Sequence, residues 1–200
     1  MQPSMLDLAE QAGLAPLEPR RHPLSRGAWV DYQPGWVHGS DEVFQTLLHE
    51  VSWRAERREM YEREVDVPRL LSWYGEGDPL PHDLLTLARR RLTEHYAGEP
   101  FVTAGMCLYR DGRDSVAWHG DTNGRSSWLD TLVAIVSFGS PRALLLRPRG
   151  GGDSRRFALG HGDLLVMGGS CQRTWEHAVP KTARAVGPRV SVQFRPEGVS

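Results

Sequence analysis

Val116-Ala117-Trp118-His119-Gly120-Asp121 is the stretch from which the interpretation of this sequence starts. Its apolar first half predicts a β-strand. Side chains two residues apart in a strand point to the same face, so the His119 imidazole and the Asp121 carboxylate are expected to converge on one point. Such a pair can bind a metal ion. A His-x-Asp pattern is short enough to occur by chance, however, and needs support from elsewhere in the chain.

A third candidate metal ligand is His177, in the segment Trp175-Glu176-His177-Ala178-Val179-Pro180. Two histidines and one carboxylate on one side of a metal form the facial triad of non-haem Fe(II) oxygenases. A zinc hydrolase can use the same ligands and stays an alternative. The competing pattern His161-Gly162-Asp163 lies in a turn, where aspartate commonly stabilises the backbone. We therefore predict that His119, Asp121 and His177 bind the metal.

The segment 189–195 predicts a strand with two different faces. Arg189, Ser191, Gln193 and Arg195 share one face, whereas Val190, Val192 and Phe194 share the other. Two guanidinium groups on an inward face need anions, and a dicarboxylate can pair with both of them. The alternative is that the polar face meets solvent. Cys107 and Tyr109 likewise share one face of the strand predicted over 101–109, where the tyrosine hydroxyl can donate to the same ligand.

Turn residues and short apolar runs dominate the second half of the chain. Strands are predicted over 101–109, 115–121, 131–138, 143–147, 156–159, 164–167, 174–179 and 189–195. Helices are predicted over 41–51, capped by Ser40 or Asp41, and over 83–96, capped by Asp83. About eight short strands with flanking helices indicate a mainly β, α+β fold that forms a jelly roll or a similar double sheet.

We expect one domain over 1–200, with an arm of little structure over 1–27, a helical part over 28–100 and a β core over 101–200. The highly charged run 53–64 is predicted to be a solvated connection. Formal net charge is −1, so a nucleic-acid partner is neither demanded nor excluded. With two cysteines, no recognisable secretory signal and no long apolar run, we expect a cytoplasmic monomer without membrane contact.

The segment 67–75 is predicted to be extended, because Pro68 excludes a helix interior. Trp73 and Tyr74 end this run. An aromatic side chain here can stack on a nucleobase, although from these residues alone packing against the core is the favoured interpretation. Three consecutive arginines, 89–91, are predicted on the outer face of the second helix, facing phosphates or solvent.

Five motifs, in order along the chain, resemble those of the AlkB-type Fe(II)/2-oxoglutarate dioxygenases. They are Cys107-Leu108-Tyr109-Arg110-Asp111-Gly112, Trp118-His119-Gly120-Asp121, Gly162-Asp163-Leu164-Leu165-Val166-Met167, Trp175-Glu176-His177-Ala178-Val179-Pro180-Lys181 and Arg189-Val190-Ser191-Val192-Gln193-Phe194-Arg195. The segment 67–75 resembles the nucleotide-recognition segment of the same family. The resemblance covers about 28–196. It implies a double-stranded β-helix with an N-terminal nucleotide-recognition segment, Fe(II) at the predicted metal triad and 2-oxoglutarate as cosubstrate.

The resemblance also implies roles for single residues. Tyr109 and Arg189 would hold the distal carboxylate of 2-oxoglutarate, and Arg195 would hold the end next to the iron. Cys107 and Ser191 would stand beside the cosubstrate, where the family usually carries asparagine. Because a thiol is a poor hydrogen-bond donor, the proximal carboxylate is expected to be held differently here.

Candidate nucleic-acid contacts follow from the same resemblance. The residues concerned are Arg69, Trp73, Tyr74, Arg110 and Asn123, with His119 beside the base and the arginines of 54–63 near phosphates. Asn123 stands where the family commonly has an acidic residue, and an amide can both donate and accept, so base recognition can persist with altered preference.

The implied function is oxidative demethylation of N-alkylated bases, such as 1-methyladenine and 3-methylcytosine, in DNA, with release of formaldehyde. A base inside a duplex must be flipped out, or be single-stranded, to be reached. The same chemistry on RNA, protein or a small molecule stays open, as does a non-catalytic binder of damaged DNA. The expected partners are alkylated DNA or RNA, 2-oxoglutarate and dioxygen.

Overall fold

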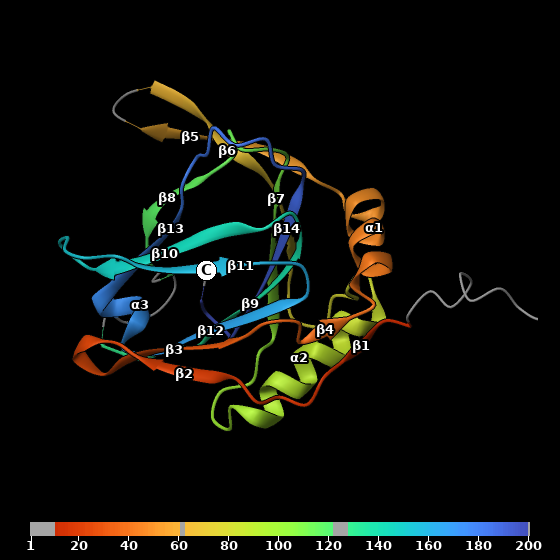
Figure 1. Ribbon diagram of the computed structural model, residues 1–200, viewed down its shortest axis with the longest axis horizontal. Coiled ribbons are helices and arrows are strands. Elements are labelled where there is room, and N and C mark those ends of the chain that lie inside the picture. Colours follow the sequence, from red (N-terminus) through yellow and green to blue (C-terminus); the bar gives the residue numbers. More distant parts are fainter. Residues whose placement is uncertain (1–10, 61–62, 122–127, 200) are drawn as a thin grey trace, which may run out of the picture.

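The computed structural model describes residues 11–60, 63–121 and 128–199. It consists of two facing β-sheets, with the two longest helices packed outside the larger one (Figure 1). The larger sheet has the strand order β2-β3-β12-β9-β14-β7-β6-β5, and the smaller sheet has the order β11-β10-β13-β8. This arrangement confirms the predicted mainly β fold with flanking helices and the double sheet of a jelly roll.

The elements have the following bounds. The larger sheet contains β2 (Arg20–Pro23), β3 (Ala28–Gln33), β5 (Arg54–Met60), β6 (Arg63–Tyr74), β7 (Thr103–Tyr109), β9 (Val133–Gly139), β12 (Asp163–Gly169) and β14 (Arg189–Arg195). The smaller sheet contains β8 (Val116–His119), β10 (Arg142–Pro148), β11 (Arg155–Leu159) and β13 (Trp175–Val179). β1 (Gly13–Leu14) pairs with β4 (Val37–His38), and the helices are η1 (Ser25–Gly27), α1 (Ser40–Glu50), α2 (Asp83–His95) and α3 (Cys171–Thr174). Within the described ranges, no helix is both long and apolar enough to cross a membrane.

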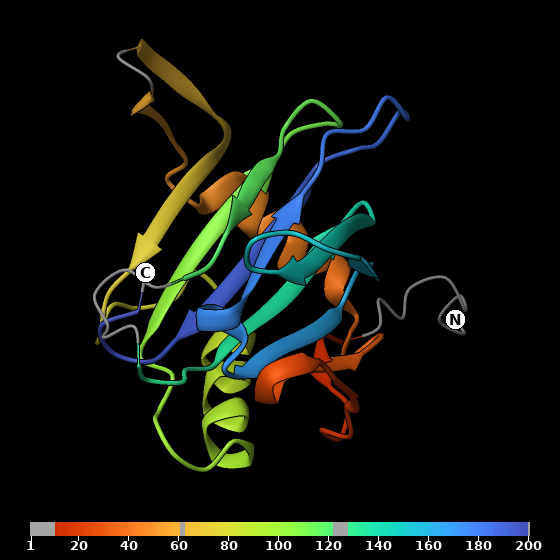
Figure 2. The same cartoon turned by 90° about the vertical axis from the view of Figure 1, so that its left-hand side faces the viewer.

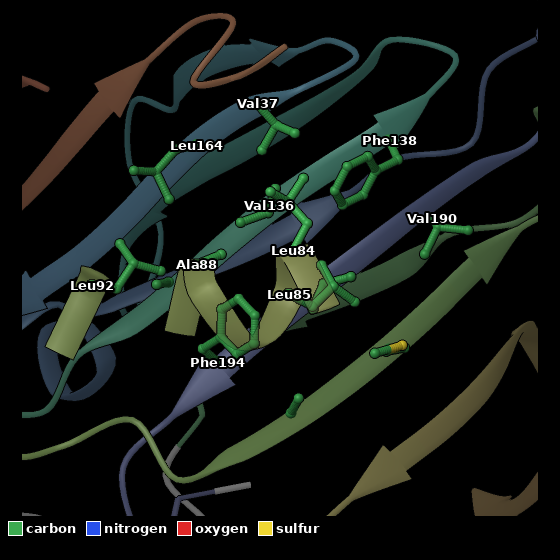
Figure 3. Packing of buried hydrophobic residues seen from close by; sticks show 14 of the residues in the cluster. Val37, Leu84, Leu85, Ala88, Leu92, Val136, Phe138, Leu164, Val190 and Phe194 are labelled. Carbon is green, nitrogen blue, oxygen red and sulfur yellow. The ribbon is translucent and has the colours of Figure 1, made fainter. Parts of the chain in front are cut away.

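Alternating side chains of the larger sheet face two different cores. Toward the helices, Val190 and Phe194 of β14 pack in one cluster with Leu85 of α2 (Figure 3). Toward the smaller sheet, Ile135 of β9 joins a second cluster with Leu146 of β10. The pleat of β14 therefore turns its polar row into the space between the sheets, which confirms the predicted two-faced strand.

Both predicted helices are present, but their N-terminal caps differ from the prediction. The residue before α1 is Gly39, with a φ of 56°, and it makes no side-chain capping bond. Before α2, the Leu84 N–H donates to His82 Nδ1 over 3.0 Å. The predictions of Ser40 or Asp41 for α1 and of Asp83 for α2 were wrong, because histidine is not among the usual capping residues and glycine reaches the left-handed conformation without cost.

The arm predicted over 1–27 is structured from residue 11 onward. β1 pairs with β4, and β2 pairs with β3 at the edge of the larger sheet. Arg21 donates two hydrogen bonds of 2.8 Å to the buried Asp31 carboxylate, and the Tyr96 hydroxyl donates to the same group. For residues 11–27, the prediction of little structure was wrong, because the partners of this segment come from distant positions in the chain; residues 1–10 lie outside the described residues.

The charged run 53–64, predicted to be a solvated connection, lies largely in a hairpin. β5 pairs with β6, and β6 continues to Tyr74 and pairs with β7 (Figure 1, Figure 2). The extended segment predicted over 67–75 is the second half of β6. The charged run lacks apolar alternation, so its strand comes from backbone pairing with β6 and not from a pattern of its own.

Candidate active site

The predicted metal ligands meet between the two sheets. His119 ends β8, His177 lies in β13, and the two are paired residues of neighbouring strands. Their ring centroids are 4.2 Å apart, and His119 Nε2 lies 3.6 Å from Asp121 Oδ1. The ligand atoms of all three side chains lie within 4.8 Å of one another. This arrangement suits one metal ion bound from one side.

Neighbouring groups set the tautomer and the protonation states of these side chains in the forms that bind a cation. His119 Nδ1 donates to the Ala117 carbonyl over 2.9 Å, which leaves Nε2 for a metal. Burial lowers the pKa of His177 to about 3, and the neighbouring His119 acts in the same direction. Burial alone would raise the pKa of Asp121, but Arg195 and the two histidines lower that pKa to about 2. Near neutral pH, His177 is therefore neutral and Asp121 is ionised, which are the forms that bind metals.

Asp121 is placed by contacts, since strand geometry does not reach it. β8 ends at His119, so the strand predicted over 115–121 was too long at its end. Arg195 Nε and Nη2 donate to Asp121 Oδ2 over 3.1 and 3.0 Å. The Asp121 N–H donates to Gln172 Oε1 over 2.9 Å. The predicted convergence of His119 and Asp121 is confirmed, although its physical basis is different.

The competing pattern His161-Gly162-Asp163 has a structural role. Asp163 accepts hydrogen bonds from three groups: the Tyr32 hydroxyl (2.8 Å), the Gly35 N–H (2.9 Å) and the Gly160 N–H (2.8 Å). His161 Nδ1 accepts from the Gly139 N–H over 2.7 Å. Among the described residues, neither side chain belongs to the metal-ligand cluster. The prediction that this pattern stabilises a turn is confirmed.

Arg189 is a buried cation with an unused donor. Its residue is 1% exposed, and its Nε donates to Ser137 Oγ over 2.9 Å. Its guanidinium carbon lies 5.3 Å from the centroid of the Tyr109 ring. Its Nη1 has no hydrogen-bond partner among the described residues. Since buried charges are normally paired, this point of the structure suits an anionic ligand.

The other predicted cosubstrate residues line the same space. Burial raises the pKa of Tyr109 to about 12, so its hydroxyl stays protonated and can donate. Cys107 and Ser191 are paired residues of β7 and β14. Gln193 donates to Ser191 Oγ over 2.6 Å and accepts from the Cys107 thiol over 3.7 Å. The polar row of β14 is thus a connected, buried group, and the alternative of a solvent-facing row was wrong.

A cleft of about 1340 Å³ is lined by two of the metal ligands, His119 and Asp121. Arg69, Trp73 and Tyr74 of β6 line it together with Trp118 and His119 of β8. Trp73 is 51% exposed, so the prediction that both aromatic residues of this run pack on the core does not hold for it. The structure therefore brings three of the predicted substrate residues to the metal centre.

Arg110, another predicted substrate residue, is not among the described residues that line this cleft. Arg110 donates through Nε and Nη2 to Asp114, over 2.8 and 2.9 Å, and lines a smaller neighbouring pocket of about 450 Å³. Asn123 lies outside the described residues. Of the arginines within 54–63, Arg54 lines the large cleft.

Two buried polar residues that the sequence did not single out support the site. Gln172 of α3, 2% exposed, holds the Asp121 backbone. Arg142, 4% exposed, donates to the carbonyls of Asp111, Asp114 and Pro180 over 2.7 to 2.9 Å, and its guanidinium carbon lies 5.6 Å from the centroid of the Tyr109 ring. Neither residue belongs to a motif. The sequence signal for Arg142 was its place directly before the apolar run 143–146, and Gln172 had no such signal.

Comparison with known protein families agrees with this geometry. The 2OG-Fe(II) oxygenase superfamily matches residues 42–195. The chain belongs to this superfamily. His119, Asp121 and His177 are accordingly its Fe(II)-binding triad.

The relatives place the chain among the AlkB-type members, which confirms the predicted resemblance. Alpha-ketoglutarate-dependent dioxygenase alkB homolog 3 of Homo sapiens is 32% identical over 184 residues, covering 81% of this chain and 64% of that protein. DNA oxidative demethylase ALKBH2 of Homo sapiens is 32% identical over 178 residues, covering 78% and 68%. The chain thus spans less than two thirds of the length of the alkB homolog 3 proteins it matches. The solved structure of OsALKBH1 has a TM-score of 0.57 at 14% identity, covering 89% of this chain and 100% of that one, which shows a shared fold.

Proposed function

We propose that this protein removes alkyl groups from the ring nitrogens of nucleobases in DNA, by an oxidation that depends on Fe(II) and 2-oxoglutarate. The observation that carries the proposal is a metal triad of which His119 and Asp121 line the same cleft as the exposed Trp73. The preference for DNA is supported by the relative named as a DNA oxidative demethylase.

The residues present fit ferrous iron. Two imidazoles and one carboxylate are the donor set that non-haem Fe(II) oxygenases use, with the remaining coordination positions open. His119 and His177 offer neutral nitrogens, and Asp121 offers an ionised oxygen. When bound with 2-oxoglutarate and dioxygen, the iron supplies the oxidation of the N-alkyl carbon, with succinate, carbon dioxide and an aldehyde as products.

The residues also fit a keto-diacid. Arg189, with its unpartnered Nη1, and the protonated Tyr109 hydroxyl together hold the distal carboxylate. Arg195, which contacts Asp121, would hold the other end, and Cys107 and Ser191, which are paired across β7 and β14, would stand beside the cosubstrate. Cys107 stands where the family usually has an amide, and its thiol donates to the Gln193 side chain. Gln193 therefore fixes the position of the residues on this side of the cosubstrate pocket.

The cleft residues orient the damaged base. Trp73 on β6 and His119 on β8 present ring surfaces to the same cleft, and a base stacks between such surfaces at a favourable free energy of about 1–3 kcal/mol per contact. 1-Methyladenine and 3-methylcytosine are cations, which favours contact with an aromatic face. Arg69, whose Nε is buried without a partner in the described part of the chain, and Tyr74 contact the flanking nucleotide. Because these lesions pair poorly, the free energy needed to flip them out is small.

A direct assay tests the proposal. The protein is loaded with Fe(II) and 2-oxoglutarate without oxygen, air is admitted, and formaldehyde is measured with oligonucleotides that carry 3-methylcytosine in DNA or in RNA. We expect formaldehyde with the DNA, none with His119→Ala, and normal release with His95→Ala, a matched control at the exposed end of α2.

Three outcomes would contradict the proposal. Formaldehyde released faster from RNA refutes the DNA preference. Succinate formed at the same rate with and without nucleic acid indicates a small-molecule or protein substrate. Tight binding of the modified oligonucleotide without any turnover indicates a non-catalytic binder of damaged DNA.

A further inference from the structure

Asp121 is the one member of the metal triad that no strand holds in place. His119 and His177 are paired across β8 and β13, whereas Asp121 follows two residues after His119, beyond the end of β8. Arg195 contacts its carboxylate, so that contact directs the side chain. The position of the Asp121 backbone has to come from another partner.

Gln172 is that partner. Its side-chain oxygen accepts the Asp121 N–H over 2.9 Å in a buried setting, and its residue is 2% exposed. Its side-chain nitrogen faces Met167 Sδ at 3.7 Å, so the amide is oriented with its oxygen toward Asp121. A thioether is a weak acceptor, and the bond to Asp121 is therefore the stronger of the two side-chain bonds.

A second contact joins Gln172 to the same turn. A Cβ atom built on Gly120 would lie 2.7 Å from the Gln172 carbonyl oxygen and 2.9 Å from Arg149 Nη2. Arg149 itself donates to that carbonyl over 3.2 Å. Gly120, between the two ligands, therefore lies in close contact with α3. A side chain at this position would clash with the Gln172 carbonyl, so only glycine fits.

We propose that Gln172 is a positioning residue for the iron site, which sets metal affinity by holding the Asp121 backbone against α3. The proposal rests on the Fe(II) triad and is independent of the substrate. Without the Gln172 acceptor, the Asp121 N–H is left buried and unpaired, and the turn relaxes away from the position in which Asp121 meets the two histidines. Partners of this kind change metal affinity by about 10- to 100-fold when removed.

The test is a titration of the metal-free full chain with Co(II). Binding is measured through the ligand-field absorption of the bound ion. Gln172→Met keeps the volume and removes the acceptor, and we expect its Co(II) dissociation constant to rise about 10- to 100-fold with a changed absorption spectrum. Gln172→Glu keeps an oxygen acceptor and should restore most of the affinity. If Gln172→Met does not fold, Gln172→Asn replaces it, because its shorter amide cannot reach the Asp121 N–H.

Ser170→Ala is the matched control. The Ser170 hydroxyl donates to the Arg26 carbonyl over 2.6 Å at the start of α3, and among the described residues its hydrogen bonds do not include Asp121 or either histidine ligand. We expect Ser170→Ala to bind Co(II) like the wild type. The proposal is overturned if the variant without the acceptor binds within threefold of the wild type, or if Ser170→Ala weakens binding as strongly. Absence of DNA demethylation by the wild-type protein, with these affinities as expected, would instead count against the proposed function.

Discussion

Replacing Arg189 by methionine should raise stability and abolish tight cosubstrate binding at the same time. The Arg189 guanidinium is fully buried, and its contacts are Ser137 Oγ and the Tyr109 side chain. Burial lowers the pKa of Arg189, because the guanidinium has lost its contact with water. In the proposed function, the cosubstrate carboxylate is the group that pairs with this charge.

The two effects differ in size. Removing one partner of a buried, hydrogen-bonded charge pair costs about 2–5 kcal/mol of binding free energy. At about 1.4 kcal/mol per factor of ten, the dissociation constant of 2-oxoglutarate should rise about 30- to 4,000-fold. In the free protein, the variant removes an unsatisfied buried donor, worth about 1–3 kcal/mol, and loses one hydrogen bond of about 1 kcal/mol. The free energy of unfolding should therefore rise by about 0–2 kcal/mol.

Two measurements check this prediction. Calorimetric titration with 2-oxoglutarate in the presence of Mn(II) gives the affinity, and urea unfolding of the metal-free protein gives the stability. Arg155→Met, on the exposed side of β11, is the control for loss of a positive charge and should change neither quantity. If Arg189→Met lowers the free energy of unfolding by more than about 1 kcal/mol while 2-oxoglutarate binds with unchanged affinity, Arg189 is a structural residue and not an anion site.

Three further predictions concern single residues of the site. The metal-free protein should lose stability as pH falls from 6.5 toward 3, by up to about 1.4 kcal/mol per pH unit from His177, because the unfolded chain protonates this residue in a range where the folded chain does not. His177→Asn should therefore show a shallower pH dependence in urea unfolding, and an unchanged slope would contradict the lowered pKa. Asp163→Ala removes the acceptor of three hydrogen bonds, so it should lower the free energy of unfolding by about 2–4 kcal/mol and leave Mn(II) affinity unchanged. Asp121→Ala should lose Mn(II) binding. The reverse result would assign the metal to the second His-x-Asp pattern. Cys107→Asn should strengthen 2-oxoglutarate binding by about 2- to 10-fold in calorimetry, because an amide is a better hydrogen-bond donor than a thiol. Weaker binding would show that the pocket requires the thiol at this position.

Local sequence patterns were sufficient wherever one strand or helix could be assessed by itself. In β14 the alternation of polar and apolar residues predicted which face meets the helices and which lies between the sheets. The apolar faces of α1 and α2 predicted both helices within a residue or two of their observed ends. These predictions succeeded because the periods of strand and helix are set by the backbone alone.

Elements that depend on a distant partner were not predictable in this way. β5 has a charged sequence and becomes a strand only because β6 lies beside it. The arm gains its structure from Asp31 and Tyr96, which come later in the chain. A backbone hydrogen bond to another segment leaves no periodic pattern in the sequence of either segment.

By itself, the sequence determined the chemistry of this protein: which side chains can bind iron, which can pair with a keto-diacid, and that they lie on short strands of a double sheet. Only the tertiary structure decided how Asp121 is held, through Gln172 and Arg195, which the chain places 51 and 74 residues away. The physical reason is that the type of a ligand depends on one side chain, whereas its position depends on buried contacts between segments that come together only when the sheets pack.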